Sequence, residues 1–274
     1  MRVLYGDDPS QFADLWLPDG DGRHRVVVLI HGGFWRTGYC LDLMDALARS
    51  LVDAGIAAWN IEYRRVGGPS DGGSGGGWPT TFDDAAAAVD HLAALPDELR
   101  HRLDLTNVAT VGHSAGGHLA TWLAARTRLP AGAPWANPTV VPTVAISQAG
   151  VLDLARGIAD DLGDRACLGV LADPASTADL EPHEIDRRVA LASPAELVPL
   201  DARIVAIHGA LDDRVPIDQS TGFIDVALAA ASDASLVTLE GADHFVHINP
   251  ESAAWAAVLD ALPEHRSARQ RRLT

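Results

Sequence analysis

Lysine is absent from the chain, and its 21 basic residues are all arginine. Schiff-base catalysis and phosphate binding by a P-loop both require a lysine, so the sequence excludes these two chemistries. Long apolar runs are absent too, because no stretch approaches the ~18 residues that a membrane-spanning helix needs. The first residues also lack the basic start and the apolar core of a signal peptide. We therefore expect a cytoplasmic protein with no membrane partner.

The chain also has few cysteines and no net positive charge. Cys40 and Cys167 are the only cysteines, and they lie far apart in the sequence without other metal-binding residues around them. We expect reduced core thiols, no metal and no cofactor. The formal net charge of −16 would repel nucleic acids, so the favoured partner is a neutral or cationic small molecule. The sequence leaves the oligomeric state open, and a homodimer is among the states that it allows.

The order of the hydrophobic segments indicates an α/β fold. With 274 residues, 47% of them hydrophobic, the chain can form one sizeable core. Short β-branched runs predict buried strands at residues 25–30, 56–62, 108–111, 140–146, 203–207 and 235–239. Alanine-rich stretches with helical spacing lie between most of them, at residues 41–54, 81–94, 118–126, 217–231 and 251–262. This alternation predicts one domain over residues 1–274, with a doubly wound, mostly parallel sheet and an antiparallel edge strand at residues 13–17.

Three segments fall outside this alternation. Residues 66–79 are so rich in glycine that we expect a flexible loop; a phosphate-binding loop is the weaker alternative, because no strand leads into the segment with a helix behind it. Residues 151–195 are too long for an ordinary connection, and their helical patterning predicts a small cap. Residues 265–274 are basic and predict a flexible tail rather than a binding segment.

The pentapeptide Gly112-His113-Ser114-Ala115-Gly116 follows an apolar strand and precedes a helix. This is the context of a nucleophile elbow, a sharp turn that holds a serine hydroxyl clear of the backbone. Glycine at both ends of the pattern suits the tight packing of such a turn. The pattern alone also arises by chance, so the flanking strand and helix carry the prediction that Ser114 is the catalytic nucleophile.

A serine nucleophile needs a base within hydrogen-bond reach. Four histidines follow Ser114 at useful positions: His183, His208, His244 and His247. His244 comes directly after the strand predicted at residues 235–239, where a loop would reach over the nucleophile, and we predict it as the base. We expect His208 to close a turn and His247 to be a packing or rim residue.

The base in turn needs a carboxylate to orient it. Two neighbouring aspartates follow the strand predicted at residues 203–207. Asp212 lies where the loop would turn its side chain toward the base, whereas Asp213 adjoins Arg214 and suits a solvated ion pair or a helix start. We therefore predict Asp212 as the acid. The order of serine, aspartate and histidine along the chain is then the order found in doubly wound hydrolases.

Backbone N–H groups should stabilise the oxyanion that forms on the substrate. Ala115, directly after the nucleophile, supplies one such group. Residues 31–35, with the sequence HGGFW, follow another predicted strand, and their glycines would allow the backbone to approach a substrate closely. We predict the N–H groups of Gly33 and Phe34 as the remaining donors.

Together these motifs resemble the α/β-hydrolase superfamily, specifically its branch of small esterases that is similar to hormone-sensitive-lipase-type carboxylesterases and kynurenine formamidases. The similarity covers about residues 25–262 and includes Glu62-Tyr63-Arg64 and Trp78-Pro79. Lipase-type esterases usually have a third glycine where this chain has Phe34. An aromatic residue followed by Trp35 is nearer the formamidase and the feruloyl or acetyl esterase pattern, which implies a substrate smaller than a large lipid.

The motifs and the resemblance predict a cofactor-free serine hydrolase that cleaves small carboxylic esters. Hydrolysis of an N-formyl amide, such as N-formylkynurenine, is an alternative that uses the same residues. A non-catalytic binding module is disfavoured, because no member of the predicted triad is missing. Trp35 and Trp78 are expected to line the substrate site and to favour short acyl groups with an aryl leaving group tolerated; each could instead be a core residue.

Overall fold

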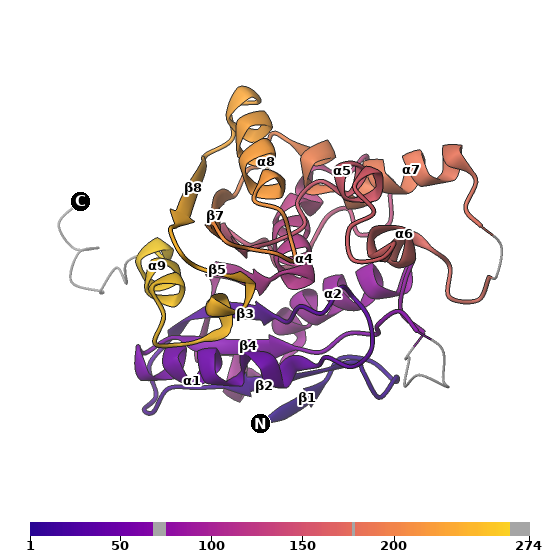
Figure 1. Ribbon diagram of the computed structural model, residues 1–274. Coiled ribbons are helices and arrows are strands. Elements are labelled where there is room, and N and C mark those ends of the chain that lie inside the picture. Colours follow the sequence, from indigo (N-terminus) through magenta and orange to yellow (C-terminus); the bar gives the residue numbers. More distant parts are fainter. Residues whose placement is uncertain (68–74, 177–178, 264–274) are drawn as a thin grey trace.

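The computed structural model of the chain describes residues 1–67, 75–176 and 179–263. At its centre is a sheet of eight strands in the order β1-β2-β4-β3-β5-β6-β7-β8 (Figure 1). The strands are β1 (Arg2–Leu4), β2 (Phe12–Trp16), β3 (His24–Ile30), β4 (Ala57–Ile61), β5 (Leu103–His113), β6 (Val144–Gln148), β7 (Arg203–Gly209) and β8 (Ala234–Leu239). β2 is antiparallel to β1 and β4, and the other neighbours are parallel. The predicted fold class is confirmed.

The antiparallel end of the sheet differs from the prediction in one respect. The strand expected at residues 13–17 is present as β2, but it is not the edge of the sheet, because β1 pairs with its outer side. β1 has three residues, and a segment this short carries no readable alternation of apolar and polar side chains.

Helices cover both faces of the sheet. They are α1 (Asp45–Asp53), α2 (Thr80–Asp90), α3 (Asp97–Arg100), α4 (Ala115–Ala125), α5 (Leu154–Ala159), α6 (Ala166–Leu171), α7 (Pro182–Ala192), α8 (Asp218–Ala229) and α9 (Ala253–Ala261). Val26 of β3 belongs to the core cluster that contains Leu119 of α4. Its neighbour Val27 points the other way, into the cluster that contains Trp255 of α9. A strand buried on both faces explains why β3 is continuously hydrophobic in sequence.

The helical segment expected at residues 151–195 lies between β6 and β7. It includes α5, α6 and α7, and its described residues form no strand. Figure 1 shows α6 and α7 beyond the ends toward which β3 and β5 run. Ligands of open α/β sheets bind outside the carboxyl ends of the strands, so we infer that this segment caps the site described below.

The two other irregular segments are described only in part. Of the glycine-rich loop at residues 66–79, both ends are described, and Trp78 N donates a hydrogen bond of 2.8 Å to the carbonyl of Ala172 directly after α6. The centre of this loop and the basic tail at residues 265–274 lie outside the described residues. Within the residues that the structure does describe, no helix is both long enough and apolar enough to cross a membrane.

Candidate active site

The predicted nucleophile occupies a sharp turn between a strand and a helix. β5 ends at His113, α4 begins at Ala115, and Ser114 between them has φ 56° and ψ −121°. This conformation is strained for a residue with a side chain, as in a nucleophile elbow. A Cβ atom added to Gly112 would lie 2.0 Å from the Gly116 carbonyl oxygen. The packing of the turn therefore requires glycine there, as the sequence indicated.

The predicted acid and base are in direct contact. Asp212 lies in the loop after β7, and His244 begins the short helix η6 (His244–Ile248) after β8. His244 Nδ1 lies 2.7 Å from Asp212 Oδ2, and the two side chains are 5% and 0% exposed. Because an ionised carboxylate only accepts hydrogen bonds, Nδ1 donates, and Nε2 is left free to accept a proton from a hydroxyl.

Asp212 is held by further donors, whereas its neighbour Asp213 is not. Asp212 Oδ1 accepts hydrogen bonds from the backbone N–H groups of Arg214 and Val215, at 2.8 and 2.9 Å. The Asp213 side chain is 75% exposed and lies 3.4 Å from the Arg214 guanidinium. Asp212 therefore contacts the predicted base His244, whereas Asp213 lies at the surface.

A second imidazole also contacts the predicted acid. His208 Nε2 lies 3.2 Å from Asp212 Oδ2 and 2.9 Å from the carbonyl oxygen of Val215, while Nδ1 lies 2.7 Å from Ser220 Oγ. Burial acts to raise the pKa of Asp212, but hydrogen bonds from His208, His244 and the Val215 N–H lower it well below its usual value. His208 therefore closes the turn, as expected, and also stabilises the charged acid, which the sequence did not reveal.

The residue before the nucleophile ties the elbow to the base. His113 Nε2 donates a hydrogen bond of 2.9 Å to the carbonyl oxygen of His244, and the two ring centroids are 4.5 Å apart. Burial, together with the nearby histidines, lowers the pKa of His113 to about 3. The neutral His113 thus adds no positive charge beside a base that must accept a proton.

Buried histidines make stability depend on pH. Burial is the main cause that lowers the pKa of His113 to about 3 and the pKa of His118 and His247 to about 4. Between these values and ~6.5, the ordinary pKa of histidine, the unfolded chain binds more protons than the folded chain. We expect the free energy of unfolding to fall, as pH is lowered through this window, by up to about 1.4 kcal/mol per pH unit for each ring.

Urea unfolding between pH ~7 and ~5 measures this loss of stability. His118→Gln is a matched variant, because glutamine can still donate to the Ala192 carbonyl that His118 Nε2 contacts at 2.9 Å but cannot take up a proton. Its curve should be flatter by the contribution of one ring. Stability that is constant over this range would contradict the low pKa values.

The predicted oxyanion loop lies against the nucleophile. A Cβ atom on Gly32 would lie 2.9 Å from Ser114 Cβ, and only 2% of Ser114 is exposed. Gly33 and Phe34 have φ values of 108° and 52°, so the backbone turns sharply at both. Their N–H groups donate to none of the described residues. Ala115 follows Ser114 directly, and its N–H has no acceptor within α4 because it opens the helix.

The two tryptophans predicted to line the substrate site are largely buried in the structure. Trp35 has 0% exposure, and its ring packs edge-on against His118 with centroids 5.2 Å apart. Trp78 is 7% exposed and packs on Phe82 at 5.4 Å. Burying such large rings stabilises the core. The Phe34 ring lies against the helical insertion, because a Cβ atom on Gly163 would lie 2.5 Å from it.

The metal-binding potential of the chain is limited in what the structure describes. Across residues 1–67, 75–176 and 179–263, no group of three or more histidine, cysteine, aspartate or glutamate side chains is arranged to hold a metal ion. Both cysteines are free thiols. Burial raises the pKa of Cys167 to about 12, so this thiol stays protonated and unreactive.

Known proteins are similar to this chain over most of its described length. The family model described as BD-FAE matches residues 13–226. Esterase LipC of Mycobacterium tuberculosis (strain ATCC 25618 / H37Rv) is 28% identical over 260 residues, covering 89% of this chain and 59% of LipC. The chain thus spans about three fifths of the length of that relative.

Solved structures share the fold. A truncated carbohydrate esterase from gut microbiota has a TM-score of 0.74 and 21% identity, covering 94% of this chain and 93% of that one. The propionate-bound form of the thermophilic esterase Est2 from Thermogutta terrifontis has a TM-score of 0.69 and 21% identity, covering 95% and 90%. The sheet order and these likenesses establish the α/β-hydrolase fold.

Proposed function

The chain belongs to the BD-FAE family, and on that premise we propose that it is a serine hydrolase that cleaves small carboxylic esters. Ser114 is the nucleophile, His244 the base and Asp212 the acid. The observation that carries the proposal is the contact of 2.7 Å between His244 Nδ1 and Asp212 Oδ2, joined to the elbow through His113. Asp212 and His244 are 32 residues apart in the sequence, and the fold brings their side chains into contact.

Catalysis would proceed through an acyl-enzyme. Ser114 Oγ attacks the ester carbonyl while His244 Nε2 takes the hydroxyl proton, and the resulting imidazolium is stabilised by Asp212. His244 then donates this proton to the leaving alcohol as the carbon–oxygen bond of the ester breaks. Water, deprotonated by the same ring, attacks the acyl group and releases the acid together with free Ser114.

The oxyanion of each tetrahedral intermediate would be stabilised by backbone donors. The N–H of Ala115 adjoins the nucleophile, and the N–H groups of Gly33 and Phe34 lie on the loop that packs against it. Each such donor typically contributes ~3 kcal/mol to the transition state. Unpaired N–H groups that are held in place before the substrate arrives need no reorganisation during the reaction.

We expect short acyl groups to be the preferred substrates, because the Phe34 ring lies between the oxyanion loop and the helical insertion. Along a series of p-nitrophenyl esters, kcat/KM should fall steeply beyond about six acyl carbons, by ~1 to 3 kcal/mol for each methylene that cannot be accommodated. The propionate-bound form of Est2 shows that this fold can hold a short acid. An optimum at ten carbons or more would contradict the proposal.

The same panel tests ester against amide chemistry. Acetate and butyrate esters of p-nitrophenol, and N-formylkynurenine, would be assayed at equal enzyme concentration. We expect turnover of the esters and little of the formamide. Faster turnover of N-formylkynurenine than of any ester would replace the ester assignment by an arylformamidase assignment.

A further inference from the structure

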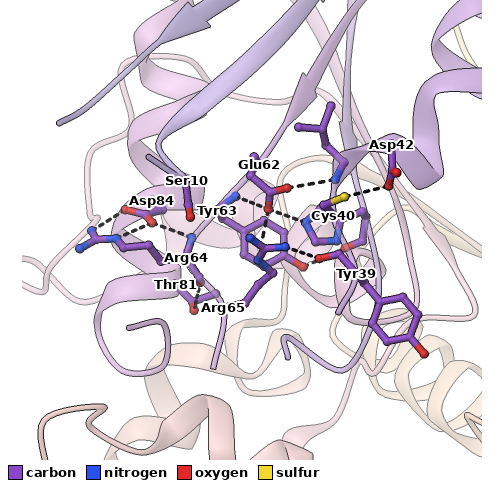
Figure 2. Close-up of polar contacts among 12 residues, drawn as sticks. Ser10, Tyr39, Cys40, Asp42, Glu62, Tyr63, Arg64, Arg65, Thr81 and Asp84 are labelled. Carbon is purple, nitrogen blue, oxygen red and sulfur yellow. Dashed lines mark hydrogen bonds and ion pairs between the residues drawn. The ribbon is translucent and has the colours of Figure 1, made fainter. Parts of the chain in front are cut away.

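Glu62 is a buried carboxylate with several partners, none of which the proposed reaction uses. It follows β4 directly and is 2% exposed. Figure 2 shows it at the centre of the polar contacts on this side of the sheet. Its Oε1 accepts from the N–H of Tyr63 at 3.0 Å, and its Oε2 accepts from the N–H of Leu41 at 3.1 Å. Residues 31–41 begin with the oxyanion loop, and Glu62 binds Leu41 at the C-terminal end of this segment.

The near end of the same segment is bound through His31. His31 Nε2 lies 3.0 Å from Glu62 Oε1, and both side chains are buried, at 0% and 2% exposure. The imidazole also stacks on the ring of Tyr63, with centroids 4.4 Å apart and planes 9° apart. Burial acts to raise the pKa of Glu62, but the contacts with His31 and the nearby Arg65 lower it overall. Glu62 is thus a charged acceptor for the ring.

The other nitrogen of His31 contacts the oxyanion loop itself. His31 Nδ1 lies 2.8 Å from the carbonyl oxygen of Gly32. Both ring nitrogens therefore face oxygen acceptors, and Nδ1 is the atom placed to donate to the Gly32 carbonyl.

The peptide that accepts this bond is the one that supplies a proposed oxyanion donor. The Gly32 carbonyl and the Gly33 N–H belong to a single planar trans peptide, in which the two groups point in opposite directions. Fixing the carbonyl on one side therefore fixes the direction of the N–H on the other. A hydrogen bond to the carbonyl also makes the N–H of the same peptide a better donor, because hydrogen bonds in a chain polarise one another.

We infer that His31, held by Glu62, is a positioning residue that orients and polarises the Gly32–Gly33 peptide toward the substrate oxyanion. The inference rests on the proposed function, because it concerns the oxyanion hole of that reaction. It gives the buried His31 and Glu62 pair a role in the transition state rather than in folding alone. The competing explanation is that the pair only braces the loop.

Two substitutions of His31 separate these explanations. In His31→Asn the side-chain N–H₂ can occupy the position of Nδ1 and keep the bond to the Gly32 carbonyl. In His31→Gln the N–H₂ can occupy the position of Nε2 and keep the bond to Glu62, while the Gly32 carbonyl loses its donor. If polarisation of the peptide matters, His31→Asn should retain more activity than His31→Gln.

The matched control is Asp84, a second buried carboxylate beside the same stretch of chain. It is 0% exposed and binds Arg64, with Arg64 Nη2 2.6 Å from Asp84 Oδ1, and Figure 2 shows this pair apart from Glu62. Asp84→Asn should lower Tm without a specific loss of kcat. Glu62→Gln removes the charge that anchors His31 and provides a test that does not alter His31.

The readouts are kcat and KM on p-nitrophenyl acetate, Tm, and the Ki of a trifluoromethyl ketone, whose adduct with the serine carries an oxyanion. In His31→Gln we expect kcat to fall ~10- to 100-fold with KM nearly unchanged and Ki to rise by the same factor. Glu62→Gln should show a smaller loss of the same kind. Two outcomes would overturn the inference. The first is a loss of kcat that parallels the loss of Tm in the two His31 variants, Glu62→Gln and Asp84→Asn; the second is a His31→Gln variant that is at least as active as His31→Asn.

The rate of labelling by a fluorophosphonate provides an independent readout, because the phosphoryl oxygen also enters the oxyanion hole. The order of the variants should be the same as for kcat. If the wild type is active and the labelling rate of each variant falls only in proportion to its Tm, the role of His31 is refuted and the proposed function remains intact. A wild type that neither reacts with the label nor hydrolyses any ester would refute the proposed function itself, and this inference with it.

Discussion

Replacing Ser114 by alanine is expected to lower kcat by ~10⁴-fold or more while leaving Tm close to that of the wild type. The hydroxyl is the proposed nucleophile, so its removal abolishes the acyl-enzyme route. Its loss should barely affect folding, because Ser114 Oγ makes no hydrogen bond with the described residues. Alanine and serine are equally strained at φ 56°, so the substitution should not destabilise the turn further.

The matched control for this variant is Ser147 in β6, a buried serine next to α4. Its Oγ has no hydrogen-bond partner among the residues that the structure describes, so Ser147→Ala should keep kcat within about two-fold. Both variants would be measured with p-nitrophenyl acetate and a fluorophosphonate label. Labelling of Ser114→Ala at another residue, with wild-type turnover, would show that the nucleophile lies elsewhere.

The contact between the proposed acid and base could be predicted because chemistry and topology constrain the two residues together. Parallel strands end at one edge of the sheet, so loops after successive strands meet there. The sequence therefore predicts that Asp212 and His244 lie near the elbow. The choice of Asp212 over Asp213 also agrees with the structure, since only the former contacts His244.

The boundaries of one central strand were less predictable. The sequence favoured a strand at residues 140–146, whereas β6 runs from Val144 to Gln148. Pro142 explains the difference: proline cannot donate to a ladder, and β6 is paired on both sides, with β5 and β7. The apolar residues before Pro142 therefore lie outside the strand.

The direction of a side chain at a tight turn could not be predicted. Trp35 is adjacent in sequence to the oxyanion loop, but φ values of 52° and 55° at Phe34 and Trp35 turn successive side chains in directions that sequence adjacency does not reveal.

The sequence prediction missed the pair of His31 and Glu62, although a signal for it existed. Ile30 and Ile61 are register partners in the parallel strands β3 and β4, so the next residue of each strand falls at the same edge.

Replacing Asp212 by asparagine should lower kcat by roughly 10³- to 10⁴-fold, whereas Asp213→Asn should leave it within about two-fold. The backbone N–H groups of Arg214 and Val215 both point at one carboxylate oxygen, so asparagine must turn its own oxygen toward them. Its N–H₂ then faces His244.

An N–H₂ group at this position donates to Nδ1 of His244 and forces the ring hydrogen onto Nε2, which can then no longer accept the proton of Ser114. The loss should therefore appear in kcat, with KM and Tm changing much less. Asp213 is the matched control because it shares the loop but is 75% exposed, with its carboxylate beside Arg214. If Asp213→Asn lost the activity and Asp212→Asn kept it, the buried contact with His244 would be structural and Asp213 would be the catalytic acid.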